Sequence, residues 1–528
     1  MLTTKALIGK GYFPDNIIPP LNTTHLANIL DELTLDNLES IIKSNGLNES
    51  KCCLHSTPRT QNLRRNFYIP NPLHQIRLCH CIENNWPEIK TFISDSPISL
   101  SSPIIIEDWP RSFKRKADWR EKRQQLALRS TAYRTMLKTD ISRYYQTIYT
   151  HSIPWALHGK ETAKANPNNF KDYFGNCLDL YVRCGMESQT IGIPTGPDSS
   201  HIISEIIGRS IERELEKSLT DYNIELKGVR FIDDFALFFK SRHDAEVALH
   251  KIHDSLKYYE LEINPNKTEI VDLPAILEID WVSNLRNFNF RNIDGKDKST
   301  AVRIQNTDIF NFFSRSFEYY KKHPDDNTLL YTLKRIKEQE ILPENWSIFE
   351  SFILKSAIYE GSCIPVVVKI LKIYEDAGFS LDKSKISSVI SEIIKYHSKF
   401  SHGYEISWAL WLAKELNIQI EAEIEEIISR CDDSIVVLVA LDLMKSNLLN
   451  SKIDTSIWCN FMNRDQLYDD HWLLAYEANI KKWLPIEGKN YIMTDPFFKI
   501  LKKHNIHFYD PEASVMSYPD LTEKSGYQ

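Results

Sequence analysis

The chain has 528 residues, of which 42% are hydrophobic and 26% are charged. This composition is ordinary for a globular protein, and at about 100–200 residues per domain the length predicts roughly two to four domains. The net charge of −7 excludes binding to nucleic acid through an overall positive surface, although a local basic segment can still serve that purpose.

The N-terminal residues do not combine a basic stretch with an apolar core, so no signal peptide is predicted. The most apolar short run, Ile435 to Leu441, is far shorter than the ~20 residues that a membrane-spanning helix needs. We therefore expect a cytoplasmic protein that has no membrane partner and keeps its cysteines reduced.

A basic segment precedes the first candidate strand. Residues 111–134 contain nine Lys or Arg residues and two acidic residues, a local balance of +7. A run of this kind is often only a solvated helix face. Because Met136 to Asp140, a predicted short strand, follows directly, we interpret the basic segment as a surface that contacts phosphates.

The next informative segment is a Gly- and Pro-rich turn, Gly192 to Pro197, which leads into a predicted helix from Asp198 to Glu216. Apolar residues at a spacing of four give this helix one buried face, and Asp198 or Ser199 can cap its N-terminus. Such a turn can present backbone N–H groups to an anion or a base pair, although most Gly-Pro loops are only turns.

Residues 228–239 are predicted to form a β-hairpin with Asp233 and Asp234 at its tip. Aspartate is common in hairpin turns, but nearly all flanking residues are apolar, so these carboxylates are expected close to buried surface. Asp140 ends its strand in a similar setting. Clustered carboxylates repel one another unless cations bind between them. Two Mg²⁺ ions about 3.5–4 Å apart would serve attack by a 3′-hydroxyl and departure of pyrophosphate, and Mn²⁺ can substitute.

A second helix, which Asp244 can cap, follows the hairpin and leads to a strand-like run and Lys267. A lone lysine in this position is normally a solvated surface residue. From Asp308 onward, amphipathic segments are separated by short polar breaks, without a clean repeat period, which predicts an irregular helical array or α-solenoid. The polar stretch Arg291 to Thr300 is the expected linker, so we expect domains at residues 1–292 and 300–528.

Four of these segments, in this order, resemble the palm of reverse transcriptases. Asp140 matches the aspartate of motif A, and Lys267 matches the lysine of motif D. Gly192 to Gly196 match motif B, and Phe231 to Asp234 match the aromatic-x-Asp-Asp motif. The resemblance covers roughly residues 60 to 290. It implies an α/β fingers-palm domain with a ferredoxin-like palm, followed here by an all-α helical-repeat domain.

The resemblance also implies roles for individual residues of a nucleotidyltransferase. The catalytic residues would be Asp140, Asp233, Asp234 and Lys267, and the two metal ions would contact the three aspartates and Ile141. Tyr145 would be the aromatic gate that excludes the ribose 2′-hydroxyl, so the substrates would be deoxynucleoside triphosphates. The other expected nucleotide contacts are Arg64, Arg65, Pro194, Thr195 and Gly196.

A narrower resemblance lies next to motif A. Thr147 to Trp155, followed by His158-Gly159-Lys160, is similar to the abortive-infection reverse transcriptases of bacterial anti-phage defence, of the AbiK-like and P2-prophage type. Lys10 to Pro14 is similar to the start of related enzymes. This resemblance implies template-independent DNA synthesis primed by the protein itself, a covalently attached single-stranded DNA product, assembly into homo-oligomers, and a helical-repeat domain in place of a thumb.

Several alternatives remain open at this point. Thr195 stands where motif B usually carries Gln, and its shorter side chain agrees with relaxed use of a template. A conventional RNA-templated reverse transcriptase is the main alternative, and a scaffold that has lost catalysis is disfavoured because all three aspartates are present. Tyr12, the only tyrosine among the first 67 residues, is a candidate primer, although packing with Phe13 in a small core is the favoured explanation.

Overall fold

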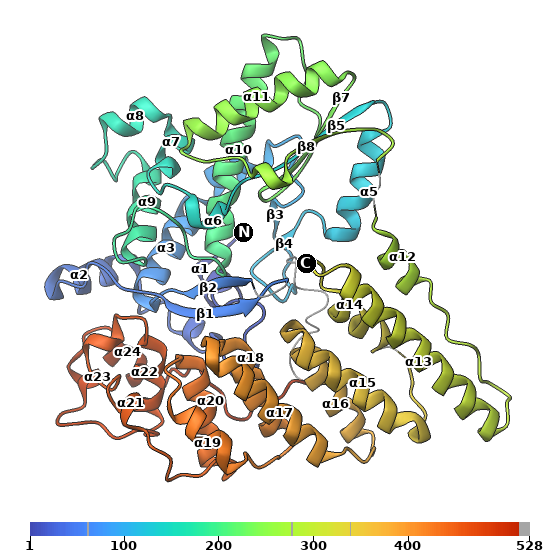
Figure 1. The fold of residues 1–528 in the computed structure, drawn as a ribbon. Helices are drawn as coiled ribbons and strands as arrows, with labels where there is room; N and C mark the ends of the chain where they lie inside the picture. Colours follow the sequence, from blue (N-terminus) through green and yellow to red (C-terminus); the bar gives the residue numbers. More distant parts are fainter. Residues whose placement is uncertain (61–62, 276–277, 338, 517–528) are drawn as a thin grey trace.

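The computed structural model describes residues 1–60, 63–275, 278–337 and 339–516 (Figure 1). A four-stranded antiparallel sheet in the order β6-β7-β5-β8 carries the three candidate carboxylates. The strands are β5 (Thr135–Asp140), β6 (Gly228–Phe231), β7 (Asp234–Phe239) and β8 (Glu269–Asp272). Apolar residues of β5 and β7 are almost fully buried, so this short-stranded sheet forms the centre of the upper half of the molecule as drawn in Figure 1.

Two long helices connect strands of this sheet in the chain. Helix α11 (Arg242–Tyr258) packs against β5, β7 and β8 through small and aliphatic residues, and α10 (Asp198–Thr220) packs against α11. The predicted helices are present, but both predicted caps are wrong. Pro197 precedes α10 and provides no side-chain cap, because the Asp198 carboxylate bonds to Arg111 and Ser112. Ser241, one turn before Asp244, caps α11 by accepting a hydrogen bond from the Asp244 N–H group.

The N-terminal region surrounds this centre with two small sheets and several helices. The hairpin of β1 (Cys53–Pro58) and β2 (Arg64–Ile69) lies between the upper half and the helices below (Figure 1). A shorter hairpin joins β3 (Pro103–Ile104) to β4 (Lys114–Arg115). The helices of this region are α1 (Thr4–Gly9), α2 (Leu35–Asn45), α3 (Pro72–Asn84), α4 (Trp86–Ser94), α5 (Trp119–Ser130), α6 (Tyr144–Thr147), α7 (Ser152–His158), α8 (Lys160–Ala165) and α9 (Phe174–Cys184).

Helices make up the described chain after β8, as the amphipathic segments predict. The segment from Arg291 to Thr300, which we expected to be a linker, is not a free one. The Arg291 guanidinium bonds to Asp308, and the next helix begins at Lys298. The helices are α12 (Asp280–Arg286), α13 (Lys298–Lys322), α14 (Thr328–Ile336), α15 (Trp346–Tyr359), α16 (Ile364–Asp376), α17 (Lys383–His397), α18 (Gly403–Glu415), α19 (Ala422–Ser429), α20 (Ser434–Lys445), α21 (Ser456–Cys459), α22 (Trp472–Ile480), α23 (Tyr491–Thr494) and α24 (Phe498–Lys503).

These helices form two layers. Helices α13, α15, α17 and α19 belong to one layer, in which α15 contacts α17 and α17 contacts α19. Helices α14, α16, α18, α20 and α22 contact one another in that order and form the second layer. The core of these helices is fully buried and includes Trp408 and Trp411 of α18 and Trp472 of α22. In the described part of the chain, no helix combines the length and the apolar character that crossing a membrane requires.

The second layer is joined directly to the N-terminal region. Helix α18 packs against β1, and the Trp472 indole donates a hydrogen bond to the Ile69 carbonyl at 3.0 Å. Leu21 and Tyr509 form an isolated antiparallel bridge, so segments from opposite ends of the chain share backbone hydrogen bonds. The N-terminal region is therefore packed against both the sheet above and the helices below.

Candidate active site at the tip of the β6–β7 hairpin

Strand register brings the three predicted aspartates together. Asp140 is the last residue of β5 and lies opposite Asp234, the first residue of β7. Asp233 occupies the turn between β6 and β7, and its carbonyl accepts a hydrogen bond from the Ile141 N–H group at 3.2 Å. The end of β5 and the hairpin tip thus form one edge of the sheet, with carboxylates from both strands.

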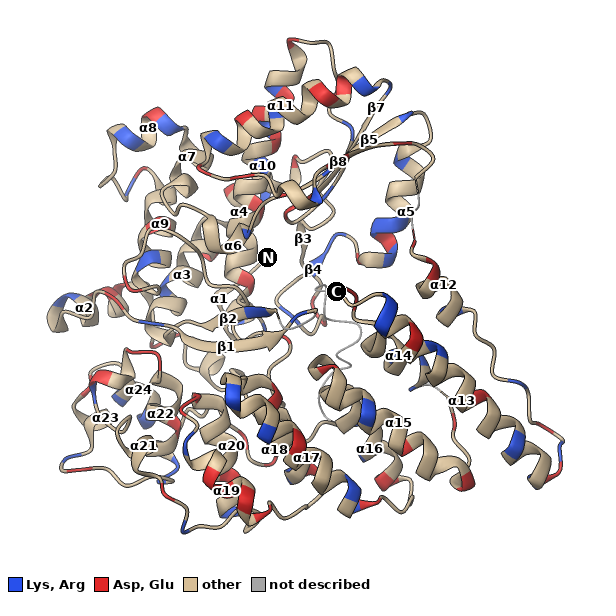
Figure 2. Cartoon of the chain, viewed as in Figure 1, with Lys and Arg blue, Asp and Glu red and all other residues tan. Residues whose placement is uncertain are grey.

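Two lysines neutralise the outer carboxylates. Lys267 lies beside Asp140, as the motif predicts, with its Nζ 2.8 Å from Oδ2. Lys122, on α5, lies 2.7 Å from Asp234 Oδ2, and its ammonium also lies over the rings of Trp119 and Phe231. Figure 2 shows α5 with its Lys and Arg residues beside the sheet. The basic segment therefore supplies a charge to the site itself.

The pKa of Asp233 is strongly raised by its surroundings. Burial and the neighbouring carboxylates of Asp140 and Asp234 raise the pKa of Asp233 to about 7, although Lys267 acts in the opposite direction. A carboxylate in this position holds its proton unless positive charge is brought next to it. The site therefore favours binding of further cations.

The donor set suits hard divalent cations, which prefer carboxylate oxygens. Among the described residues, however, the only group of three candidate ligands with donor atoms within 4.8 Å of one another is His397, His402 and Glu405. Both oxygens of Glu405 are bonded to Arg64, so a guanidinium already occupies the place of a cation there. At the hairpin, binding of divalent ions requires Asp140 and Asp234 to turn away from their lysines.

The turn that carries Asp233 is strained, and side chains outside the turn hold its backbone by hydrogen bonds. Ile232 has φ of 60°, a left-handed conformation that β-branched residues rarely adopt. Its N–H group donates to the Ser101 hydroxyl at 2.8 Å, and its carbonyl accepts from the Arg230 guanidinium at 3.0 Å. Both backbone groups of the strained residue are thus bonded to side chains outside the turn.

Arg230 belongs to a buried ionic network. Its guanidinium bonds to Glu205 and Glu212 of α10, and all three side chains are fully buried. Burial raises the pKa of Glu205, but the Arg230 charge outweighs it and lowers the pKa to about 2. Gly208 makes room for this network, because a Cβ at that position would lie 2.6 Å from Arg230 Nη1. The turn that carries Asp233 therefore rests on a fixed, charged support.

The predicted gate residue is fixed between α10 and the motif B turn. The Tyr145 hydroxyl lies 3.0 Å from Ser204 Oγ, and its carbonyl accepts from the Ile193 N–H group at 2.8 Å. Two further N–H groups of the Gly192 to Asp198 region donate to the carbonyls of Ile148 and Gly11. The prediction that this turn presents its N–H groups to a ligand is wrong for these three groups, because they are bonded within the protein.

The rest of the motif B turn is covered by the N-terminal region. Pro194 and Thr195 are buried, and the Thr195 carbonyl accepts from the Tyr68 N–H group at 2.8 Å. At Gly196, where φ is 127°, an added Cβ would lie 3.0 Å from Pro14 and 3.3 Å from Phe67. Contact between these residues and a template strand would require this cover to move.

Two predicted roles do not fit the structure. Arg64 was expected near the nucleotide, but its guanidinium bonds to both carboxylate oxygens of Glu405 on α18. Arg65 is its neighbour on β2, opposite Thr57. Tyr12, the candidate primer, is fully buried against Phe13 and donates to the Pro70 carbonyl, and burial raises the pKa of its phenol. Its hydroxyl is not accessible in this conformation.

The motifs did not single out two cations that lie at the β6–β7 hairpin. Lys122 is one of them, and Arg115 of β4 is another, with its guanidinium carbon 5.9 Å from the centroid of the Phe231 ring. The basic segment was the only sequence signal for either residue. It indicated a surface that contacts phosphates, without indicating which of its cations faces the site.

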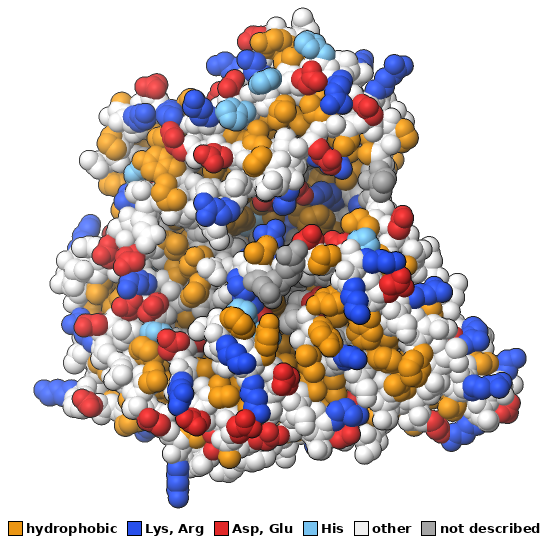
Figure 3. Space-filling view, in the orientation of Figure 1, with side chains coloured by type: hydrophobic (Ala, Val, Ile, Leu, Met, Phe, Trp, Pro, Cys, Tyr) orange, Lys and Arg blue, Asp and Glu red, His pale blue; other side chains and the backbone are white. Residues whose placement is uncertain are grey.

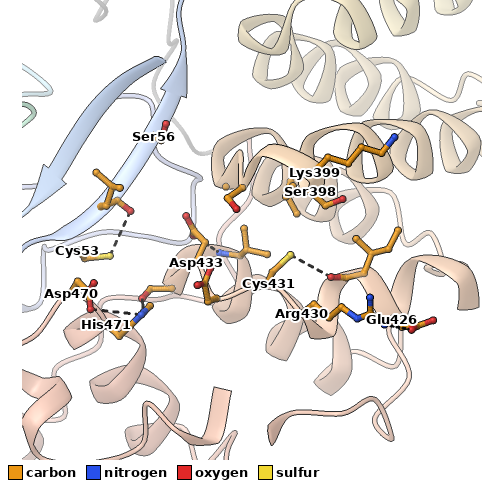
Figure 4. A pocket seen from close by; sticks show the side chains of 18 of the residues that line it. Cys53, Ser56, Ser398, Lys399, Glu426, Arg430, Cys431, Asp433, Asp470 and His471 are labelled. Atoms are coloured by element: carbon orange, nitrogen blue, oxygen red, sulfur yellow. Dashed lines mark hydrogen bonds and ion pairs between the residues drawn. The ribbon is translucent and has the colours of Figure 1, made fainter. Parts of the chain in front are cut away.

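A separate cavity of about 680 Å³ opens between β1 and helices α18 to α20 (Figure 4). Five acidic side chains line it against two basic ones, Lys399 and Arg430. The acidic residues are Glu423, Glu426, Asp432, Asp433 and Asp470. This balance is unfavourable for a triphosphate, so the hairpin tip remains the candidate active site.

The class of protein follows from comparison with known families. Residues 78–304 match the family model described as reverse transcriptase (RNA-dependent DNA polymerase). This range includes the three aspartates, both lysines and the motif B turn. The chain therefore contains a reverse transcriptase domain and is a nucleotidyltransferase of the reverse transcriptase and DNA polymerase type.

Solved structures include two telomerases with weak similarity. One is telomerase from Candida albicans in complex with a fragment of telomeric RNA, with 12% identity, a TM-score of 0.31, and coverage of 72% of this chain and 70% of that one. The other is apo telomerase from Candida tropicalis, with 11% identity, a TM-score of 0.32, and coverage of 74% and 70%. Both TM-scores are too low to establish a shared fold. No curated protein matches the chain significantly.

Proposed function

We propose that this protein is a DNA polymerase of the reverse transcriptase type that adds deoxynucleotides without a template, begins on a hydroxyl of its own chain, and acts in anti-phage defence. The observation that carries the polymerase assignment is the meeting of Asp140, Asp233 and Asp234 at one sheet edge. The burial of the motif B turn under Pro14, Phe67 and Tyr68 supports synthesis without a template. The resemblance around Thr147 to Trp155 supports the defence role and self-priming.

The three aspartates would hold two Mg²⁺ ions, with Ile141 contributing through its carbonyl, and Mn²⁺ would substitute. When bound, the ions would activate the attacking hydroxyl and stabilise the leaving pyrophosphate. Lys122 and Lys267, released from Asp234 and Asp140, would then be free to neutralise the triphosphate of the incoming nucleotide. Arg115 lies beside Phe231 and would serve the same purpose, whereas Tyr145 would exclude a 2′-hydroxyl.

We also propose the domain organisation that this function needs. Strand β5 and α10, then β6, β7, α11 and β8, follow one another in the order of a ferredoxin-like palm. The two layers of helices after residue 300 would be a helical-repeat-like domain in place of a thumb, joined to residues 1–292. Assembly into a homo-oligomer is part of the proposal and is checked by light scattering after size-exclusion chromatography.

A conventional RNA-templated reverse transcriptase is the second candidate. The description of the matching family, an RNA-dependent DNA polymerase, favours it. The covered motif B turn counts against it, because a template base would have to displace Phe67 and Pro14 from Gly196.

The deciding experiment supplies each radiolabelled deoxynucleotide with Mg²⁺ to the purified full-length protein, without template or primer. We expect label to remain with the protein under denaturing conditions, and mass spectrometry of the nuclease-trimmed product to identify the modified peptide. A parallel reaction contains an RNA template with a DNA primer. Synthesis only in the parallel reaction would replace the proposal with the templated alternative.

The matched control is the double variant Asp233→Asn with Asp234→Asn. It removes two carboxylate charges and keeps the shape of the side chains, so we expect a folded protein with no nucleotide addition. Thermal melting verifies that the variant is folded. Undiminished synthesis by the folded variant would reject the polymerase assignment.

A further inference from the structure

The outer face of the first helical layer carries a line of exposed aromatic rings. Phe310 on α13, Tyr359 on α15, Tyr396 on α17 and Phe400 just after α17 are exposed to 45%, 57%, 47% and 56%. Figure 3 shows hydrophobic side chains, interspersed with Lys and Arg, on the face below the hollow in the surface. A soluble protein seldom leaves several large rings exposed together unless they bind something.

The rings form a continuous line because partly buried aromatic residues connect them. The Phe352 ring lies 5.3 Å from Phe310 and 6.0 Å from Phe317. The Tyr320 hydroxyl donates to the Tyr359 carbonyl at 3.1 Å, at the point where α13 and α15 end. We call Phe310, Phe317, Phe352, Tyr359, Tyr396 and Phe400 the aromatic strip.

The line continues from α15 to the β1–β2 hairpin. Helix α17, which carries Tyr396, packs against α15, which carries Tyr359. Phe400 lies 5.5 Å from Tyr396 and 5.4 Å from His402. The Glu405 side chain, one turn beyond His402, bonds to Arg64 of β2. The aromatic strip therefore leads to the N-terminal region that covers the motif B turn.

Cations accompany these rings. Lys355 lies 6.0 Å from the centroid of Phe317, and Lys399 directly precedes Phe400. Both lysines are exposed, and neither has a carboxylate within ion-pair distance among the described residues. Aromatic rings beside unpaired cations are the combination that binds single-stranded nucleic acids, since rings stack on bases and cations attract phosphates.

We propose that the aromatic strip binds single-stranded DNA, and specifically the product as it leaves the active site. The proposal rests on the proposed function, which makes an unpaired DNA strand. Bases of a duplex are already stacked and paired, so they do not offer their faces to rings on a protein surface. Stacking does not distinguish among the bases, which suits a product whose sequence no template dictates.

The test measures binding of a fluorescein-labelled oligothymidylate of about 20 nucleotides to the full-length protein by fluorescence anisotropy. The strip variant combines Tyr359→Ala, Tyr396→Ala and Phe400→Ala. The control variant combines Phe170→Ala and Tyr222→Ala, which are exposed to 42% and 51% outside the aromatic strip. We expect the strip variant to bind at least about tenfold more weakly and the control variant to bind normally. We also expect Lys355→Gln to reduce the salt dependence of binding.

Equal affinity of the strip variant and the native protein would overturn the proposal, as would preference of the native protein for a duplex of the same length. A change in the oligomeric state of the strip variant would also overturn it, because it would show that a second copy covers the aromatic strip. The same titration with the Asp233→Asn, Asp234→Asn variant separates this proposal from the proposed function. Binding that persists without synthesis supports the surface independently of catalysis.

Discussion

Ser101 connects the turn that carries Asp233 to the buried ionic network of Arg230, Glu205 and Glu212. Its hydroxyl accepts from the Ile232 N–H group at 2.8 Å and donates to Glu205 Oε1 at 2.7 Å. Neither Ser101 nor Glu205 contacts the carboxylates of the site, but the backbone of the strained turn depends on both residues. The position of the Asp233 carboxylate is therefore set partly by a residue that is more than a hundred positions earlier in the chain.

We expect Ser101→Ala to lower the rate of nucleotide addition by about tenfold, because an unpaired buried N–H group costs about 1–3 kcal/mol and releases the turn. The concentration of Mg²⁺ needed for half the maximal rate should rise at the same time. Ser102→Ala is the matched control, since the Ser102 hydroxyl also faces Glu205, at 3.4 Å, and does not contact Ile232. Equal metal requirements in the two variants would contradict the role of Ser101.

Tyr145 is expected to determine the choice of sugar. Its hydroxyl lies 3.0 Å from Ser204 Oγ on α10, so the ring cannot move aside for a bulkier ribose without losing this contact, while its backbone carbonyl is held by the Ile193 N–H group. We expect Tyr145→Val to raise kcat/KM for ribonucleotides relative to deoxynucleotides by about tenfold or more. Tyr145→Phe keeps the ring and should still reject ribonucleotides. If Tyr145→Val retains deoxynucleotide activity and also rejects ribonucleotides, another residue is the gate.

At the scale of elements, the Arg64–Glu405 pair fastens β2 to α18. The Glu405 side chain is 1% exposed and the Arg64 side chain 18% exposed, so the pair is largely shielded from water. We expect Arg64→Ala to lower the free energy of unfolding by about 3–5 kcal/mol, because it leaves a buried carboxylate without its partner.

The control for this prediction removes both charges. Arg64→Leu with Glu405→Leu should recover most of the lost stability in urea unfolding, since no buried charge remains. KM for deoxynucleotides should be unchanged in Arg64→Ala once the protein is folded. A large increase in KM with little loss of stability would restore the expected role of Arg64 as a nucleotide contact.

Local sequence patterns are sufficient for the hairpin and the helices, but not for the groups that surround the site. Apolar runs on either side of Asp233 and Asp234 predict β6 and β7, and Lys267 is found beside Asp140 as its motif predicts. The partners of Lys122 and Arg64 lie 112 and 341 residues away. No local periodicity identifies such pairs, because they depend on how distant elements pack.

The helix starts show the same limit on a smaller scale. Asp198 and Asp244 are good N-cap residues by type, yet Pro197 and Ser241 occupy the cap positions. Asp198 bonds instead to Arg111, and this ion pair could not be foreseen from the residues next to it. Tertiary contacts override local preference wherever a charged side chain has a buried partner.

At the scale of the whole molecule, the two halves share one packed structure. Trp472 donates a hydrogen bond to the Ile69 carbonyl, and Asn71 donates one to the Leu467 carbonyl. These two hydrogen bonds cross the proposed domain boundary in opposite directions. We expect a fragment that ends near Asn292 to be insoluble or inactive, because it exposes the surface of β1 and β2 that α18 covers. Co-expression with residues 300–528 should restore activity. A soluble fragment that polymerises at the full rate would contradict this.

The bridge between Leu21 and Tyr509 also bears on how the protein is made. During translation, the segment around Leu21 leaves the ribosome before almost all of the helices that will cover it exist. Contacts between such distant residues form late and slowly, whereas local structure forms early. A nascent chain thus carries an uncovered N-terminal region until residues beyond position 500 have emerged. Nucleotide addition that depends on this closed arrangement has to wait until then.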